Sequence, residues 1–194
     1  VNFISISLLC LLVSPLAAQP GEFDSTFSGD GIASLYDSES VTRYGFNDLL
    51  LEPDGDILVF GNTSGIEGGT TSLLTRYDST GTSDTSLGIQ TGFDGFDFTN
   101  RLLQTVRGVF DASGRILLAG ADFQPIGKGY SAPDAPFFAR LDSSLNLDST
   151  FENDGYTTLS LPLPGPVPYS LSLQDDGKII SAVTNPVSEG RVIR

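Results

Sequence analysis

The chain has 194 residues, with 24 Asp and Glu against 10 Lys and Arg, which gives a formal net charge of −14. Nucleic acids and anionic membranes are bound through clusters of Lys and Arg, so this charge argues against both partners. The sequence has no His, no Met and no Trp, and its single Cys is Cys10. Ser-His-Asp and Cys-His nucleophile systems, zinc sites and haem ligation are therefore excluded.

An apolar segment opens the chain. Residues 3–13 are almost unbroken apolar, and Pro15-Leu16-Ala17-Ala18 then supplies the small residues that signal peptidase needs. We predict a signal peptide over residues 1–18, although the basic residues that usually begin one are missing. A retained anchor is the alternative, but this run falls short of the roughly twenty residues that span a bilayer. The exported chain, residues 19–194, would be secreted, periplasmic or on the cell surface, without cysteine and without membrane contact.

Two sequence motifs then recur with the same spacing. An Asp-Ser-Thr-Phe block begins at Asp24, has a degenerate copy at Asp84 and returns at Asp148, in steps of 60 and 64 residues. A second motif, a turn before an apolar run, is centred on Gly55, Gly114 and Gly177, in steps of 59 and 63 residues. Two motifs that move together indicate a tandem repeat of about sixty residues.

Each repeat contains a predicted β-hairpin. In the first repeat, residues 48–52 and 57–61 are short apolar segments around a turn in which Gly55 can take the positive φ of a two-residue hairpin. The second strands, residues 57–60 and 116–119, are continuously apolar, as in strands covered on both faces. We therefore expect each sheet to lie between neighbouring sheets.

Two further strands complete the predicted unit. A third is expected at residues 72–78 and 136–142, and a fourth, after the Asp-Ser-Thr-Phe block, at Gly31 to Tyr36 and Tyr156 to Leu161. Four antiparallel strands per sixty-residue repeat are typical of a β-propeller blade. The prediction is an all-β fold of tandem four-stranded antiparallel blades, a partial β-propeller, with blade strands at about 21–36, 48–93, 104–161 and 168–184.

These motifs resemble the delta-60 repeat. The spacing of Leu/Phe-Asp-Ser-Thr-Phe-x-x-Asp-Gly, then Asp-Gly-Lys-Ile, then Ala-Arg-Leu-Asp over most of residues 21–183 is similar to this family of bacterial exported proteins. The middle copy departs from the pattern, with Leu87 in place of Phe and no Asp-Gly after it. The resemblance implies a propeller-type architecture and export, and it implies no catalytic residues.

The strand count predicts an incomplete propeller. The chain begins with a fourth strand, contains two full units and stops after the first hairpin of a third, whereas a closed propeller typically has four or more blades. A fragment of a longer reading frame is the favoured explanation. Assembly with copies of itself and an open stack with exposed, association-prone edges are the alternatives.

Acidic residues gather in the repeated blocks. The side chains that could give oxygen ligands to calcium are Asp24, Asp30, Asp148 and Asp154, or Asp94 and Asp97. Asp in a turn more simply bonds to the backbone, so we predict no cofactor and keep a calcium-stabilised surface adhesion module as an alternative. No carboxylate pair stands apart from these turns, so a propeller-based lyase or glycan hydrolase is also only an alternative.

The two ends of the predicted sheets differ in their loops. Turns such as Pro53 to Asp56 are short, whereas long and variable connections gather at the opposite end. Insertions on repeat scaffolds often carry the binding site. We hypothesise a surface for a protein or glycan partner there, formed by Tyr44, Phe96, Phe98, Phe123 and Tyr130. The alternative is that these aromatics pack beneath their own loops. The predicted function is a non-enzymatic extracytoplasmic repeat scaffold or binding module.

Overall fold

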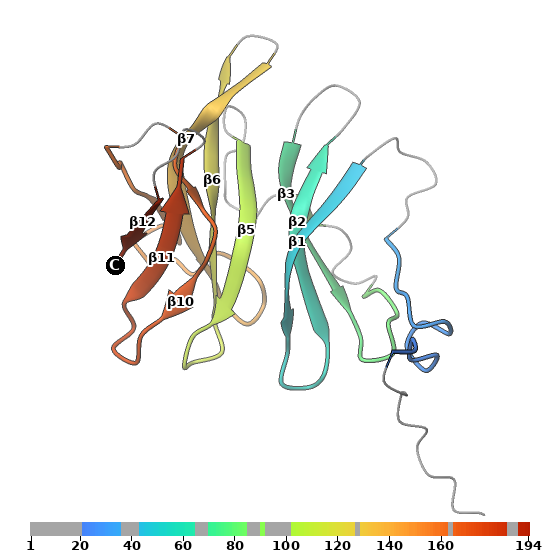
Figure 1. The fold of residues 1–194 in the computed structure, drawn as a ribbon. Helices are drawn as coiled ribbons and strands as arrows, with labels where there is room; N and C mark the ends of the chain where they lie inside the picture. Colours follow the sequence, from blue (N-terminus) through green and yellow to red (C-terminus); the bar gives the residue numbers. More distant parts are fainter. Residues whose placement is uncertain are drawn as a thin grey trace, which may run out of the picture.

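The chain folds into β-strands and turns. The computed structural model describes residues 21–35, 43–64, 70–84, 90–91, 102–126, 129–162, 165–185 and 190–194. Within these ranges the chain has no helix, and its strands form three antiparallel sheets that stand side by side in chain order (Figure 1). The predicted all-β class is therefore confirmed. We call the sheets sheet 1, sheet 2 and sheet 3.

Sheets 1 and 2 are meanders in which each strand pairs with the next. Sheet 1 has the order β1-β2-β3-β4 and comprises β1 (Arg43–Leu51), β2 (Ile57–Ser64), β3 (Thr70–Tyr77) and the short β4 (Gln90–Thr91). Sheet 2 repeats the order with β5 (Leu102–Phe110), β6 (Ile116–Ile126), β7 (Gly129–Leu141) and β8 (Tyr156–Thr158). The sixty-residue step of the sequence is therefore a step from one sheet to the next.

Sheet 3 follows the same plan with an interrupted first strand. It comprises β9 (Val167–Pro168), β10 (Ser172–Leu173), β11 (Ile179–Thr184) and β12 (Gly190–Ile193). Both β9 and β10 pair with β11, and the gap between them falls where β1 and β5 carry β-bulges, at Asn47 and Val106. The sequence predicted that the third unit stops at its first hairpin. This is wrong, because β12 adds a third strand.

The hairpin turns are alike in all three sheets. After β1 the amide of Glu52 donates to the carbonyl of Asp56 (2.7 Å), and the amide of Gly55 donates to the carbonyl of Glu52 (2.9 Å). Gly55, Gly114 and Gly177 have φ of 96°, 77° and 80°, the left-handed region that favours glycine. The bonds define a three-residue loop with a bulge rather than the predicted two-residue turn. The predicted role of the glycines is confirmed.

Each sheet has two faces that differ in what covers them. We define the front face by Leu58 and Phe60 of β2 or their equivalents, counted from the hairpin glycine, and the back face by Ile57 and Val59 or their equivalents. β5 contacts β1, β2 and β3, so the front of sheet 1 packs on the back of sheet 2. The buried core between them consists of Leu58, Phe60, Leu74, Ile116, Leu118, Phe137, Ala139 and Leu141.

The first strand of sheet 2, β5, is in close contact with sheet 1. Gly108 lies so near Phe60 that an added Cβ would stand 2.8 Å from its ring. The amide of Gly108 donates to Asp48 Oδ2 (3.0 Å), and Arg107 Nη1 donates to the carbonyl of Asn47 (3.0 Å). Apolar packing and polar contacts thus fix sheet 2 on sheet 1 at the level of the two bulges.

The second strands differ in how they are covered. Residues 116–122 of β6 are all buried, so both faces of this strand are covered, as predicted. In β2, Leu58 and Phe60 are fully buried but Ile57 and Val59 are only half-buried. No described sheet lies on the back face of sheet 1, so the predicted cover on both faces is wrong for this strand.

The N-terminal segment also differs from its prediction. A fourth strand was expected near Gly31 to Tyr36, but residues 32–35 form no strand. In sheet 2 the equivalent segment, β8, is a strand because it pairs with β7. No described third strand lies beside residues 32–35 to give them the same partner. Residues 1–18, the predicted signal peptide, lie outside the described residues.

Candidate functional site

Two of the predicted calcium ligands cap the turn of the Asp-Ser-Thr-Phe block. Asp24 Oδ1 accepts hydrogen bonds from the amide (2.9 Å) and the hydroxyl (2.7 Å) of Thr26. Asp148 Oδ1 accepts the same two bonds from Thr150 (3.0 and 2.6 Å). The Thr26 hydroxyl and amide lower the pKa of Asp24. The interpretation of these carboxylates as turn caps is therefore confirmed.

The other predicted ligands are placed in the same way. Asp30 and Asp154 accept a hydrogen bond from the amide two residues further on, at 2.9 and 3.5 Å. In the part of the chain that the structure describes, no three or more Asp, Glu, His or Cys side chains are grouped so that they could hold a metal ion. Asp94 and Asp97 lie outside the described residues.

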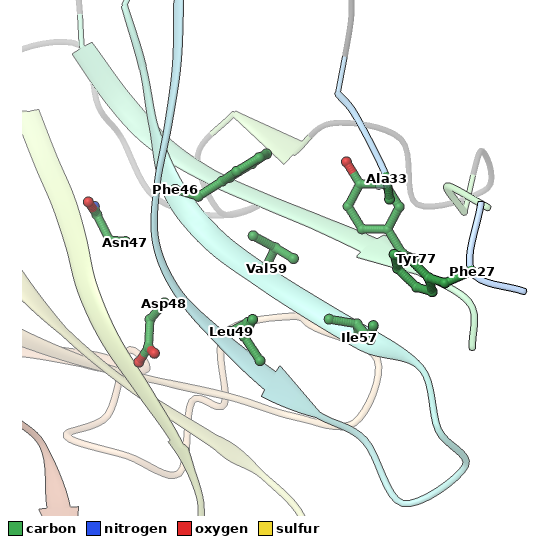
Figure 2. A pocket seen from close by; sticks show the side chains of 9 residues that line it. All are labelled: Phe27, Ala33, Phe46, Asn47, Asp48, Leu49, Ile57, Val59 and Tyr77. Carbon is green, nitrogen blue, oxygen red and sulfur yellow. The ribbon is translucent and has the colours of Figure 1, made fainter. Parts of the chain in front are cut away.

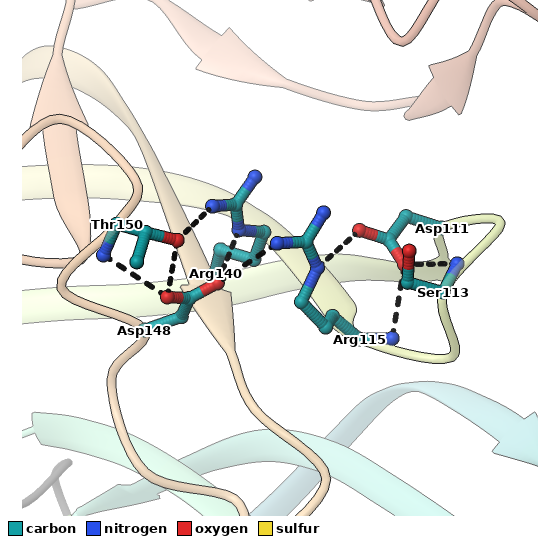
Figure 3. A network of polar contacts seen from close by, with 6 residues as sticks. All are labelled: Asp111, Ser113, Arg115, Arg140, Asp148 and Thr150. Atoms are coloured by element: carbon teal, nitrogen blue, oxygen red, sulfur yellow. Dashed lines mark hydrogen bonds and ion pairs between the residues drawn. The ribbon is translucent and has the colours of Figure 1, made fainter.

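Asp148 is the centre of a charged network on sheet 2 (Figure 3). Its Oδ2 lies 2.8 Å from Arg140 Nε and 3.3 Å from Arg115 Nη1. Arg115 Nε in turn lies 2.7 Å from Asp111 Oδ2, and Arg140 Nη2 donates to Thr150 Oγ1 (2.9 Å). The network joins the end of β7, the β5–β6 turn and the block that follows β7.

The electrostatics of this network indicate a structural role. Hydrogen bonds from Thr150, joined by the bond and charge of Arg140, lower the pKa of Asp148 to about 2. A general acid or base needs a pKa near the working pH, and this carboxylate stays ionised far below it. In sheet 1 the equivalent arginine, Arg76, pairs with Glu52 (2.7 Å) and Asp84 (3.8 Å). Both networks hold the end of a third strand to its neighbours.

The aromatic residues predicted as a binding surface lie, where described, at one end of the sheets. Tyr44 is near the start of β1, and Phe123 and Tyr130 are in the outer half of the β6–β7 hairpin. This is the end opposite the glycine turns, and the hairpin projects there beyond the rest of sheet 2 (Figure 1). Phe123 is half-buried. Phe96 and Phe98 lie outside the described residues.

A cleft that the sequence did not predict lies on the back face of sheet 1 (Figure 2). Its volume is about 600 Å³, and its lining includes Phe27 and Ala33 of the N-terminal segment and Phe46, Leu49, Ile57, Val59 and Tyr77 of sheet 1. Phe46 and Leu49 are 49% and 59% exposed. An open apolar face of this kind usually marks a contact surface.

Tyr77 gives this cleft an unusual polar group. The side chain is 4% exposed, and no described group forms a hydrogen bond with its hydroxyl. Burial raises the pKa of Tyr77. The equivalent residue in sheet 2, Leu141, lies in the core. Sequence reasoning missed the cleft because it assigned a neighbour to both faces of every sheet. The available signal was that Ile57 to Phe60 belongs to the first sheet in the row.

Comparisons with known proteins give no identification. No family model matches the chain, and a comparison with curated proteins likewise gives no match. The resemblance to the delta-60 repeat therefore stays a prediction from its motifs. Among the described residues there is also no helix with the length and apolar character needed to cross a membrane.

Proposed function

We propose that this chain is a non-enzymatic extracytoplasmic repeat module, built from propeller-type blades, which binds a protein or glycan partner at the end that carries the long connections. The observation that carries the proposal is the contrast between the two ends of the sheets. One end has the same glycine turn three times. At the other end sheet 2 differs from its neighbours, because β6 and β7 have 11 and 13 residues, against 8 each in β2 and β3 and 6 and 4 in β11 and β12.

The construction of the sheets supports the blade arrangement. Each sheet is an antiparallel meander, and the front of sheet 1 covers the back of sheet 2. All three first strands are interrupted at the same position. Propeller blades are four-stranded sheets repeated in this manner, and the resemblance to delta-60 repeats points the same way.

The projecting hairpin supports the location of the binding end. β6 and β7 remain paired out to Ile126 and Gly129, past the level of Phe123. Aromatic side chains provide contact area at low entropic cost and are enriched in binding surfaces. The net charge of −14 disfavours acidic glycans, so neutral glycans are the first probes.

Three of the described carboxylates support a role other than catalysis. Asp24, Asp111 and Asp148 accept hydrogen bonds from turn amides or arginines. A carboxylate lyase or glycosidase needs one group free to take or give a proton at the working pH. These side chains are used to hold turns and strand ends.

Affinity electrophoresis in gels that contain a neutral soluble glycan, such as dextran, galactomannan or a β-glucan, tests the proposal. We expect at least one glycan to retard the chain and the double variant Phe123→Ala/Tyr130→Ala to migrate freely with an unchanged melting temperature. Retardation that persists in this variant would place binding elsewhere.

A photo-reactive side chain separates a protein partner from a glycan. Introduced at Tyr130, it should cross-link the chain to an exported protein of the same cells if the partner is a protein. The matched control is the same group at Ser113, an exposed residue in the turn at the opposite end. Equal cross-linking from both positions would contradict a binding surface at the long-loop end.

A further inference from the structure

The hairpin turn of sheet 2 carries an arginine that the other two turns lack. The residue after the hairpin glycine is Arg115 in sheet 2, but Asp56 in sheet 1 and Lys178 in sheet 3. Arg115 Nε lies 2.7 Å from Asp111 Oδ2 in the same turn, and its Nη1 lies 3.3 Å from Asp148 Oδ2 in the Asp-Ser-Thr-Phe block. The sequence therefore adds one guanidinium group to the charged network of sheet 2.

This network has fewer carboxylates for each guanidinium group than the network of sheet 1. In sheet 1 the guanidinium of Arg76 has two carboxylates beside it, Glu52 at 2.7 Å and Asp84 at 3.8 Å. In sheet 2 the guanidinium groups of Arg115 and Arg140 share two carboxylates. No described group forms a hydrogen bond with Nη2 of Arg115 or with Nη1 of Arg140. Each of these arginines thus keeps one terminal nitrogen that can donate to a ligand.

The two remaining nitrogens point in the same direction. Arg115 and Arg140 both bind Oδ2 of Asp148, so their guanidinium groups lie side by side. In Figure 3 the terminal nitrogen without a dashed line points, in both arginines, away from Asp148 and toward the ribbon of sheet 3 at the top of the view. Arg140 is also held by Thr150 Oγ1 (2.9 Å) and by the ring of Phe151, whose centre lies 5.0 Å from its Cζ. Donors that are fixed before a ligand arrives lower the entropic cost of binding.

A cleft of about 120 Å³ lies between these arginines and sheet 3. Besides the two arginines, its lining includes Leu117 and Phe151 of sheet 2 and Leu173 and Ile179 of sheet 3. Apolar walls lower the local dielectric constant and so strengthen charged hydrogen bonds beside them. Pockets for drug-sized ligands have about 300–1,000 Å³, so this cleft has room for one small polar group.

We propose that this cleft binds one oxyanion group, a carboxylate, sulfate or phosphate, which bridges Arg115 and Arg140. Guanidinium groups bind such oxyanions through charge-assisted hydrogen bonds. The oxyanion accepts hydrogen bonds from Nη2 of Arg115 and Nη1 of Arg140. The two side chains are 35% and 17% exposed, so the site is open to solvent. The site lies at the glycine-turn end of the sheets, so the inference does not rest on the proposed function.

The net charge of −14 opposes the approach of an anion from a distance. At physiological ionic strength the Debye length is about 8 Å, so exposed carboxylates farther away are largely screened. The carboxylates within the network are Asp111 and Asp148, and both already accept hydrogen bonds from turn amides and from arginine. The affinity of the site is therefore set by the donors at contact distance.

Equilibrium dialysis against sulfate, phosphate or acetate, in chloride buffer of constant ionic strength, tests the site. We expect at least one of these ions to bind saturably, with one ion per chain. Arg115→Gln should weaken this binding by about tenfold or more, because it removes one of the two charge-assisted hydrogen bonds. The matched control is Lys178→Gln, which makes the same charge change on an exposed side chain outside the lining and should leave binding unchanged. Melting curves confirm that both variants are folded.

A second variant removes the space and keeps both arginines. Leu173 lies four residues before its hairpin glycine, as Phe110 does in sheet 2, and Phe110 packs against the core between sheets 1 and 2. Leu173→Phe should fill the cleft and abolish oxyanion binding with every charge unchanged. In NMR spectra of the arginine Nε–H groups, the bound ion should shift the signals of Arg115 and Arg140 in the wild type and not in this variant.

The outcomes identify the ligand and separate this inference from the proposed function. Tighter binding of sulfate or phosphate supports a tetrahedral oxyanion, whereas tighter binding of acetate supports a carboxylate. The proposal is overturned if none of the three ions binds saturably, or if Arg115→Gln and Leu173→Phe bind as the wild type does. Glycan retardation should persist in Arg115→Gln, and oxyanion binding should persist in Phe123→Ala/Tyr130→Ala. Failure of one proposal therefore leaves the other intact.

Discussion

Replacing Gly108 by Ala tests how closely sheets 1 and 2 are packed. The added Cβ would stand 2.8 Å from Cε2 and 3.2 Å from Cζ of Phe60, whereas carbon atoms in contact are about 3.5–4.0 Å apart. Phe60 is fully buried, so the ring cannot swing into solvent. The substitution must either separate the sheets or force the ring from its rotamer, and overpacking of this kind costs about 1–3 kcal/mol.

Urea unfolding measures this cost directly. We expect Gly108→Ala to lower the midpoint without changing the slope, because the surface exposed on unfolding stays the same. In a chain of this length 1 kcal/mol corresponds to about 2–4 °C, so the melting temperature should fall by about 2–12 °C. Phe60→Leu shortens the side chain that Ala meets. The double variant should therefore be more stable, by about 1 kcal/mol, than the sum of the two single effects predicts.

Gly45→Ala is the matched control. Gly45 is also in a first strand, and the nearest atom to its added Cβ is the carbonyl oxygen of Asn62 at 4.0 Å. Its effect should stay within about 0.5 kcal/mol. The close packing of Phe60 on β5 is refuted if Gly108→Ala unfolds at the same urea concentration as the wild type. It is also refuted if its effect simply adds to that of Phe60→Leu.

Three further predictions concern polar groups. Asp148→Asn should lower the free energy of unfolding near neutral pH by about 1–2 kcal/mol, because it removes the anionic partner of Arg140. The pKa of Asp148 is lowered from 3.8 to about 2, so this contribution is present above about pH 4 and lost as the pH falls through 2; urea midpoints that fail to converge in acid would contradict it. Tyr77→Phe should raise the free energy of unfolding by up to about 1 kcal/mol, because it removes a buried hydroxyl that no described group pairs with; a fall in melting temperature would show that the hydroxyl has a partner. Thermal melts with calcium and with a chelator should superpose, since turn amides already occupy the block carboxylates; a chelator-sensitive melt would instead support a bound ion.

The sequence predicted the strands well because each hairpin carries its own turn chemistry. Gly55, Gly114 and Gly177 all need a left-handed backbone, and an apolar run follows each of them. Turn and run together fix the position and direction of the two flanking strands. The sixty-residue spacing then places equivalent strands in successive sheets, which the structure shows for β2, β6 and β11.

Whether a strand is buried on one face or on both could not be predicted in this way, because this depends on which sheets pack beside it. Val59 and Leu118 occupy equivalent positions, yet Leu118 is fully buried and Val59 is half-buried. Residues 23–31 and 147–155 have closely similar sequences and turns, but only the second copy continues into a strand, beside β7. One local pattern therefore gives two environments, and the difference lies in the order of the sheets.

In the candidate site, too, one part could be predicted from the sequence and another could not. The loop lengths placed Tyr44, Phe123 and Tyr130 at one end, and the strand registers put them there. The cleft under Phe46 and Leu49 gave no such signal, because its residues look like ordinary strand positions. The end of the sheets could be inferred from the spacing between motifs, but Tyr44, Phe123 and Tyr130 lie in strands and not in the expected long loops. A surface formed by an uncovered sheet requires knowledge of what packs on it.

The two interfaces between the described sheets are unequal, and this bears on the stability of sheet 3. Leu58, Phe60 and Leu118 have no exposed surface between sheets 1 and 2. Between sheets 2 and 3, clefts of about 120 and 450 Å³ remain, and Ile179 in both of them is only half-buried. In stacked repeats each interface adds its own term to the stability of the sheets that it joins. Among the described sheets, sheet 3 has one such interface, and it is loosely filled. Sheet 3 therefore gains less stability from its neighbour than sheet 1 gains from sheet 2.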